Sequence, residues 1–439
     1  MSSNRKKRFD ERPEVDVPVK TSFLALSAFV AAVVAVVFML GVNFVYNSIY
    51  PVLAERGPVA FAVGSFLALA VSSLLIGSLY IEFLDKPSPS GIPNLKESYK
   101  NEYARFRFKP IFVNIIAGII SLGCGASLGR EGPTVFASGA TAALCGKLAG
   151  LSLQRRRIVC VAGAAAGLAA AFNTPIAAIM FICEVLNDKM NGRQMGGLLL
   201  ASVIGACTSW AVIGRHPAYI VPELSSLCTA DYILTPFAAL AAAAVGIFFQ
   251  RQALKLRKKV RASSVKPWLR PFVGSMFVWV IGVSVFLISG RLGIFSIGFQ
   301  DLSAGLNGEV VWYIALLLLA GKVVATVLAY SWGCCGGVFA PNLFFGTMAG
   351  LVIGGLAQLC GVELGQHGML LLALVGMSSC LGAVIRAPLT ALMIVFEMTN
   401  RYEIIPPLMI GTVVSQAYAY YFSDKISLYN AVLRQDGVE

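Results

Sequence analysis

The sequence predicts an all-α protein that crosses a membrane many times. Of its 439 residues, 57% are hydrophobic and only 13% are charged, a composition too apolar for a soluble chain of this length. Apolar tracts that can each cross about 30 Å of hydrocarbon as a helix recur along the chain. Shorter apolar segments, interrupted by glycine and proline, lie between them. These observations exclude a soluble fold.

The apolar tracts fall into two classes by length. The long tracts, each sufficient for a spanning helix, cover residues 23–49, 58–84, 109–128, 197–213, 231–250, 270–289, 309–331 and 402–422. The short or interrupted tracts cover residues 133–151, 157–173, 175–186, 337–360, 368–385 and 388–398. Short, broken segments in corresponding positions of two halves indicate a transporter with a binding site near the middle of the membrane.

The two halves of the sequence resemble each other. The segment Pro175–Glu184 is similar to Pro388–Glu397, and in both a proline begins an apolar run that a glutamate ends. The two prolines are 213 residues apart (388 minus 175), and so are the two glutamates (397 minus 184). The segment Gly132–Phe136 is similar to Ala340–Phe344, in the same order along the chain. We therefore predict two membrane repeats.

The predicted organisation has five parts. They are a cytoplasmic N-terminal tail (1–20), a first membrane repeat (21–213), a connecting loop (214–230), a second membrane repeat (231–422) and a short C-terminal segment (423–439). The net charge is +13, and its basic clusters lie at 5–8, 155–157 and 251–270. Because basic loops stay in the cytoplasm, we expect a multi-pass protein of the cell (inner) membrane with both termini cytoplasmic.

Other chemistry finds little support in the composition. Only Trp268 is interleaved with the basic clusters, so stacking on nucleic-acid bases is not expected. The ten cysteines lie mostly in apolar tracts and form no Cys-x-x-Cys pair, which predicts free thiols rather than a disulfide or metal site. We expect membrane lipid as a partner, and neither a cofactor nor a catalytic residue.

The stretch Gly129-Arg130-Glu131-Gly132-Pro133 places two charges inside a long apolar region. Ionisable residues at membrane depth are costly and usually line a pathway or have a partner. Pro133 suits the first turn of a helix, and such a start offers free N–H donors to an anion. The stretch therefore predicts the start of a broken membrane helix. A surface loop with a paired arginine and glutamate is the alternative.

Three further stretches interrupt the apolar pattern. Pro87–Pro93 contains Ser90, Gly333–Pro341 offers amides at a second helix start, and Tyr429 follows the last apolar tract. Together these neutral donors could replace the water around an anion without a full positive charge, which would hold the anion too tightly for transport. The alternatives are a turn, a glycine hinge and an interfacial anchor.

These motifs together resemble the CLC family of chloride channels and chloride/proton exchangers, in its prokaryotic type without a regulatory domain. The family's Gly-Ser-Gly-Ile-Pro motif appears as Pro89–Pro93, and its Gly-Arg-Glu-Gly-Pro motif is intact at 129–133. Its Gly-x-Phe-x-Pro motif is intact at 337–341, and its late tyrosine matches Tyr429. The resemblance covers roughly residues 20–435 in the right order.

The resemblance implies a homodimer with one anion pathway per subunit, built from two inverted repeats of tilted, broken and re-entrant helices. It implies chloride and other weakly hydrated anions as the transported ligands. By position it implies that Ser90 and Tyr429 bind the anion through hydroxyls, and that Val338 and Phe339, beside Gly337, bind it through backbone amides. Glu131 is implied as the gate, with the backbone of Arg130 and Gly132 along the path.

Two positions depart from the family pattern. Pro89 replaces the first glycine of the serine motif. Val185 stands where exchangers of the family place a second, proton-carrying glutamate, and a valine cannot relay a proton. The neighbouring Glu184 is expected to have the structural role of its repeat mate Glu397. We therefore expect chloride transport gated by Glu131, with proton exchange weakened by Val185; the alternative is a chloride channel without proton coupling.

Two more distant alternatives follow from single motifs. Gly125-Ala-Ser127-Leu-Gly129 fits Gly-x-Ser-x-Gly, which raises a membrane-embedded serine hydrolase, but a nucleophile elbow needs a strand–turn–helix context and a basic partner. A fluoride-exporting branch of the family is expected to depart from the serine motif, and Ser90 keeps it. A transporter remains the better interpretation, and the protein is not expected to be an enzyme.

Overall fold

The computed structural model describes residues 19–83, 91–101, 104, 106–186, 192–215, 217–224, 227–423 and 425–438. Within these ranges the chain forms seventeen α-helices and three short helical turns, and no strand beyond one isolated bridge. Eight of these helices are long and apolar enough to cross a membrane. The prediction of an all-α, multi-pass membrane fold is confirmed.

The first half of the chain holds eight helices. They are α1 (Thr21–Glu55), α2 (Pro58–Phe83), α3 (Gly91–Asn101), α4 (Phe108–Gly123), α5 (Glu131–Leu148), α6 (Leu153–Phe172), α7 (Pro175–Phe181), which continues into a π-helical turn at Ile182–Leu186, and α8 (Gly192–Val212).

The second half holds nine. They are α9 (Thr229–Arg261), α10 (Arg270–Ser289), preceded by the short turn η2 (Pro267–Leu269), α11 (Phe299–Leu306), α12 (Trp312–Ser331), α13 (Phe339–Leu359), α14 (Gly368–Ile385), α15 (Pro388–Thr399), α16 (Ile405–Phe422), preceded by a 3₁₀ turn at Tyr402–Ile404, and α17 (Leu428–Gln435).

Both halves interrupt their helices with the same device. Helix α6 ends at Asn173 and α14 ends at Arg386, each in the left-handed conformation with φ of 58° and 57°. The next helices then begin at Pro175 and Pro388, since proline is already set for a first helical turn. The matching order of stop and start in the two halves agrees with the sequence similarity between them.

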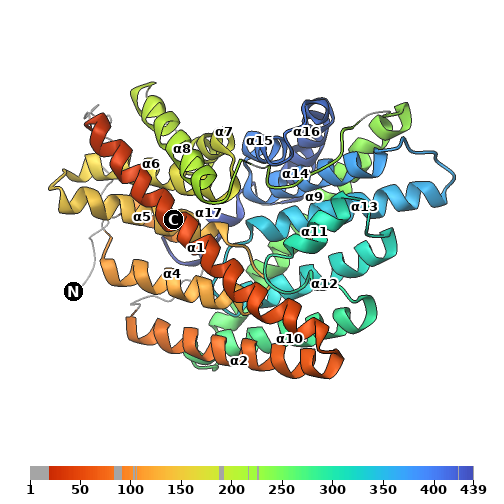
Figure 1. The fold of residues 1–439 in the computed structure, drawn as a ribbon, viewed down its shortest axis with the longest axis horizontal. Helices are drawn as coiled ribbons and strands as arrows, with labels where there is room; N and C mark the ends of the chain where they lie inside the picture. Colours follow the sequence, from red (N-terminus) through yellow and green to blue (C-terminus); the bar gives the residue numbers. More distant parts are fainter. Residues whose placement is uncertain are drawn as a thin grey trace.

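The core is made of paired helices that are buried over most of their length. Helix α5 packs on α6 and α13 packs on α14. Glycine makes the second pair close: a Cβ on Gly346 or Gly376 would lie 2.1 or 2.2 Å from the other residue's carbonyl oxygen. Small residues allow such close packing of membrane helices. Figure 1 shows α2 and α10 along one edge of the protein and α7, α8, α15 and α16 along the opposite edge.

Four predicted tracts differ from the helices. Segments 337–360 and 368–385, interpreted as interrupted, form the full-length apolar helices α13 and α14, because their glycines serve packing and not helix breaks. Helix α4 ends at Gly123 instead of filling 109–128, so the chain from Cys124 to Arg130 is free to bend into the protein. The tract 402–422 is divided between a 3₁₀ turn and α16.

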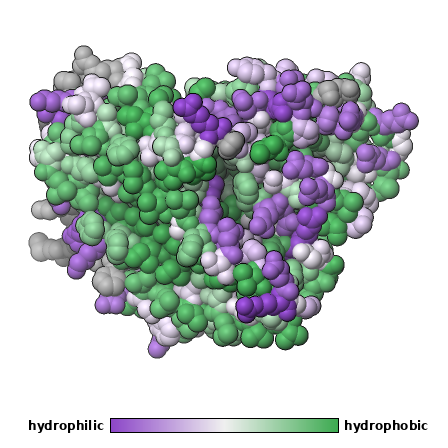
Figure 2. Space-filling model, viewed as in Figure 1, coloured by the Kyte–Doolittle hydropathy of each residue, from purple (hydrophilic) through white to green (hydrophobic). Residues whose placement is uncertain are grey.

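The surface fits a lipid environment. Large apolar side chains are exposed on the outer helices, among them Phe44 on α1, Val59 on α2, Ile288 on α10 and Val413 on α16. Figure 2 shows apolar residues over much of one face, with hydrophilic residues bordering a hollow near its middle. A broad apolar surface of this kind is what contact with lipid requires.

Candidate functional site

The two glycine-rich helix starts meet at the centre of the protein. The Gly129 amide donates to the Gly337 carbonyl over 2.7 Å, and the Gly337 amide donates to the Gly129 carbonyl over 2.6 Å. A Cβ on Gly132 would lie 3.1 Å from the Gly337 Cα. Only glycine allows backbones this close. The starts of α5 and α13 are therefore held side by side. Because the Gly337 amide already donates to Gly129, it is not free to donate to an anion.

Glu131 lies between the two helix starts. Its side chain is fully buried, with 0% exposure. Carboxylate Oε2 accepts a hydrogen bond from the Ala340 amide over 3.2 Å, at the first turn of α13. The other oxygen, Oε1, has no hydrogen-bond partner among the described residues. The carboxylate thus occupies the N-terminal end of a helix, where free amides and the helix dipole favour an anion.

The contact with Ala340 was missed by the sequence interpretation. That interpretation expected free N–H donors for an anion at the start of the helix near Pro133 and named no donor to Glu131 from the second half. In the structure a described donor comes from the other half of the chain. The sequence did contain one indication of this contact. The alignment of Gly132 with Ala340 marks both residues as first-turn positions of corresponding helices.

Val338 and Phe339 form the start of α13. Val338 is the N-cap residue and Phe339 the first helical residue, and both are buried. Amides in the first turn have no acceptor within their helix, so they are available to a ligand. The Phe339 ring packs against Phe172, at 5.6 Å between centroids, and against Phe181, at 6.3 Å. These contacts fix the position of the helix start.

Tyr429 lies on α17 and is only 2% exposed. Its hydroxyl makes no hydrogen bond to a described residue, and it lies near Tyr330 and Glu131. A buried polar group without a partner is costly. This hydroxyl is therefore a group for which a bound ligand would supply the missing partner.

Ser90, and Pro89 before it, lie outside the described residues. The residue that follows, Gly91, begins α3 and packs tightly on the start of α5: a Cβ there would lie 2.0 Å from the Gly132 carbonyl oxygen. Helix α3 is also joined to α17, because Lys96 Nζ donates to Asn430 Oδ1 over 2.7 Å. The segment after Ser90 is thus tied both to the Glu131 helix and to the Tyr429 helix.

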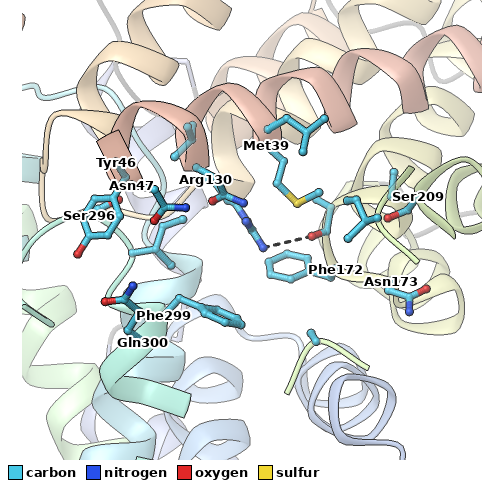
Figure 3. A pocket seen from close by; sticks show the side chains of 18 of the residues that line it. Met39, Tyr46, Asn47, Arg130, Phe172, Asn173, Ser209, Ser296, Phe299 and Gln300 are labelled. Atoms are coloured by element: carbon cyan, nitrogen blue, oxygen red, sulfur yellow. Dashed lines mark hydrogen bonds between the residues drawn. The ribbon is translucent and has the colours of Figure 1, made fainter. Parts of the chain in front are cut away.

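Arg130 lines a cavity of about 490 Å³ beside the Gly129–Pro133 stretch. Its Nη2 donates to the Ala171 carbonyl over 3.4 Å, and its guanidinium lies 5.9 Å from the centre of the Phe172 ring. Figure 3 shows the Arg130 side chain extending between Asn47 and Ser296 on one side and Phe172 on the other. A cation among neutral amides and hydroxyls can attract an anion toward the buried Glu131.

Val185 and Glu184 lie in the π-helical turn after α7. Val185 is buried. The Glu184 carboxylate accepts hydrogen bonds from the Leu389 amide (3.1 Å), the Thr390 amide (2.7 Å) and the Thr390 hydroxyl (2.6 Å), all at the start of α15. These bonds cap the helix of the other half, so Glu184 has the structural role that the sequence predicted.

Glu397 makes the same contact in the opposite direction. Its carboxylate accepts hydrogen bonds from the amides of Ile176 (2.9 Å) and Ala177 (2.7 Å) at the start of α7. Each half therefore ends a helix with a glutamate that caps the corresponding helix of the other half. Carboxylates suit helix N-termini because they accept from free amides.

Ser127 does not form a hydrolase elbow. Its hydroxyl lies 3.3 Å from the Thr326 hydroxyl on α12, and its segment is an irregular bend between two helices. Within the described ranges no strand precedes it. The strand–turn–helix context that a nucleophile elbow needs is not present there.

Comparison with known proteins identifies the family. The family model described as voltage gated chloride channel matches residues 72–420. The chain belongs to the CLC family. CLC proteins are transporters and channels rather than enzymes, and they need no cofactor.

CLC relatives of this chain include named exchangers. The H(+)/Cl(-) exchange transporter ClcA of Vibrio cholerae serotype O1 (strain M66-2) is 30% identical over 377 residues, which cover 81% of this chain and 78% of that protein. A putative chloride channel protein ClcB-like from Ralstonia nicotianae is 28% identical over 324 residues, covering 70% of this chain and 71% of that protein.

Solved structures confirm the CLC fold. A slow cyanobacterial Cl-/H+ antiporter matches with a TM-score of 0.83 and 21% identity, covering 96% of this chain and 98% of that one. A eukaryotic CLC transporter matches with a TM-score of 0.75 and 17% identity, covering 95% of this chain and 74% of that one. At these identities the likeness concerns the fold alone.

Proposed function

We propose that this CLC protein transports chloride across the cell membrane through a path between the starts of α5 and α13, and that Glu131 is its gate. One observation carries the proposal: the buried Glu131 carboxylate accepts from the Ala340 amide at a helix start, which is where a dehydrated anion would bind. Chloride and this carboxylate then compete for one site. Protonation of Glu131 removes the competitor and lets chloride bind.

The anion is bound by neutral donors. We assign this role to the Tyr429 and Ser90 hydroxyls and to the amides of Val338 and Phe339, with Gly337 and Gly132 providing close backbone approach. The unpartnered Tyr429 hydroxyl and the first-turn position of the amides support the assignment. Neutral donors compensate dehydration without trapping the ion, so it can leave again.

Proton coupling is the second part of the proposal. The similarity to proteins named as chloride/proton exchangers supports exchange. Val185 cannot carry a proton, and Glu184 next to it is engaged by three hydrogen bonds at the start of α15. We therefore propose weak coupling in which water bridges the inner end of the proton route. The same two residues favour the alternative, a channel without proton coupling.

The assembly is a homodimer of subunits that each contain two inverted repeats, at 21–213 and 231–422, with both termini in the cytoplasm. Apolar side chains exposed on α7, α8, α15 and α16, which line one edge of the subunit, support this edge as the dimer contact: Ile176, Leu199, Val203, Leu389, Met409 and Val413. Membrane lipid covers the other outer helices.

The deciding experiment uses purified protein in liposomes. Under a chloride gradient, the reversal potential is measured against an imposed pH gradient, and proton flux is recorded at the same time. A reversal potential that shifts with pH supports exchange. One that follows chloride alone, at single-channel amplitude, supports the channel alternative.

Anion preference tests the binding residues separately. We expect chloride, bromide and nitrate to pass far better than fluoride or sulfate, because a few hydroxyls and amides cannot offset the dehydration of fluoride. The measurement is efflux of each anion from the same liposomes. A preference for fluoride over chloride would remove the basis for assigning Ser90 and Tyr429.

A further inference from the structure

A small cavity lies where α9 ends and α10 begins, beside the end of α12. It has a volume of about 50 Å³, and its lining includes Tyr80, Arg257, Arg261 and Arg270. This "Arg270 cavity" therefore brings three guanidinium groups together with the end of α2. None of these residues takes part in the proposed chloride site.

The charges around the Arg270 cavity do not balance. Arg257 binds both oxygens of Asp436, with Nη1–Oδ1 at 2.8 Å and Nη2–Oδ2 at 3.0 Å, and Arg261 also pairs with Oδ1. Arg270 donates to two carbonyl oxygens, those of Val265 and Arg261, and forms no ion pair with a described residue. Among the described residues, one carboxylate thus faces three guanidinium groups, which leaves an excess of positive charge in this part of the structure.

Tyr80 provides an independent sign of a missing ligand. Its side chain lines the cavity and is only 4% exposed. Its hydroxyl makes no hydrogen bond of ordinary geometry to a described residue, and the group beside it is the weakly polar Cys335 thiol. The oxygens of a phosphate group could accept hydrogen bonds both from the buried Tyr80 hydroxyl and from the Arg270 guanidinium, which has no carboxylate partner among the described residues.

The location indicates where that phosphate comes from. Helix α2 carries the exposed apolar side chains Leu74, Leu75 and Ile81 on the faces turned away from the buried Tyr80, so the helix that closes this side of the cavity has lipid tails on its outer side. The turn η2 packs on the same helix, with the Trp268 carbonyl against Gly77. Basic residues and tryptophan beside an apolar surface mark the headgroup level of a membrane.

We propose that the Arg270 cavity binds the phosphate group of an anionic phospholipid. Arg270 and Tyr80 contact the phosphate directly, while Arg257 and Arg261 add charge and remain bound to Asp436. Asp436 is the C-cap residue of α17, so an occupied cavity strengthens the network that anchors the helix carrying Tyr429. The binding claim stands without the proposed transport function; only the link to Tyr429 rests on it.

The test measures lipid binding to the full-length protein in neutral detergent. Phosphatidylglycerol, phosphatidylcholine and inorganic phosphate are added separately, and retained lipid and the thermal denaturation temperature are recorded. We expect phosphatidylglycerol to be retained and to stabilise the protein. Arg270→Gln should weaken this binding about tenfold or more, and Tyr80→Phe about two- to tenfold, as expected for loss of a charged and a neutral hydrogen bond.

The matched control is Lys258→Gln, which removes the same charge from an exposed position on α9 that does not line the cavity. It should bind phosphatidylglycerol like the unchanged protein, and so should Glu131→Gln, which disables the proposed gate. Equal losses in Lys258→Gln and Arg270→Gln would overturn the proposal, because they would indicate general charge attraction. Stabilisation by inorganic phosphate without lipid retention would overturn the lipid assignment.

Discussion

Two pairs of corresponding residues join the two halves of this protein, and they differ in kind. Glu184 and Glu397 are identical, and each caps a helix start of the other half. Glu131 and Phe339 also correspond, since Gly132 aligns with Ala340, but one is an acid and the other an aromatic residue. The matched pair holds the halves together. The unmatched pair places one ionisable group at the start of α13, where its carboxylate accepts from the Ala340 amide and where we propose that it acts as the gate.

The largest change in transport is expected from Glu131→Gln, because the glutamine side chain cannot gain or lose a proton. At a pH where Glu131 is ionised, we expect chloride efflux to rise about tenfold or more, which corresponds to a coupling of about 1.4 kcal/mol, and pH dependence to disappear. Proton transport should be lost. Chloride efflux from liposomes across a range of pH measures both effects.

Glu131→Asp is the matched control for that variant. It keeps the charge on a shorter arm, so it should fill the site less well while remaining sensitive to pH. If Glu131→Gln retained the original pH dependence, or still moved protons against their gradient, Glu131 would not be the gate.

A smaller change is expected from Tyr429→Phe, which removes a hydroxyl that lacks a described partner. Loss of one neutral hydrogen bond to chloride should weaken chloride binding about two- to tenfold. Isothermal titration of the purified protein with chloride checks this. The denaturation temperature without chloride should not fall, since no described bond is broken; a large fall would make Tyr429 a structural residue.

Substitutions in the matched pair should lower stability and leave transport almost unchanged. Glu184→Gln and Glu397→Gln each weaken a helix cap, so each should lower the free energy of unfolding by about 1–2 kcal/mol. Chloride transport per folded protein should change little. Thermal denaturation and efflux measured on one preparation separate the two effects, and a selective loss of transport in either variant would contradict the structural role.

The smallest effect on chloride is expected from Val185→Glu. Chloride affinity should stay within about twofold, because a change away from the anion path adds or removes no donor there. The ratio of proton to chloride flux should rise if the inner proton route is restored. Met398→Glu, at the corresponding buried position of the other half, is the control and should not raise that ratio.

The sequence predicted the features that depend on local chemistry. The helix starts near Pro133 and Pro341 and the equivalence of Glu184 and Glu397 were readable, because proline, glycine and charge act where they stand in the chain. The contact between Glu131 and Ala340 was not readable, because it depends on how two distant segments pack. Gly129 and Gly337 look like flexible hinges in sequence, whereas in the structure they bind each other.

Glycine also misled the prediction of helix length. Gly346, Gly350 and Gly376 suggested interruptions in α13 and α14, but each lies where the two helices touch. In water a glycine weakens a helix, while between membrane helices it allows close packing. Single-sequence patterns do not distinguish these roles, since the difference lies in what the helix faces.

The position of the Glu131 carboxylate also sets a concentration scale. A ligand tethered by one short side chain has an effective concentration of about millimolar or more at its own site, regardless of how much chloride is in solution. Dissolved chloride must exceed that value to displace it, unless a proton arrives first. In the proposed mechanism the protein therefore carries its own competitive inhibitor of chloride binding, and the surrounding pH decides how much of that inhibitor is ionised.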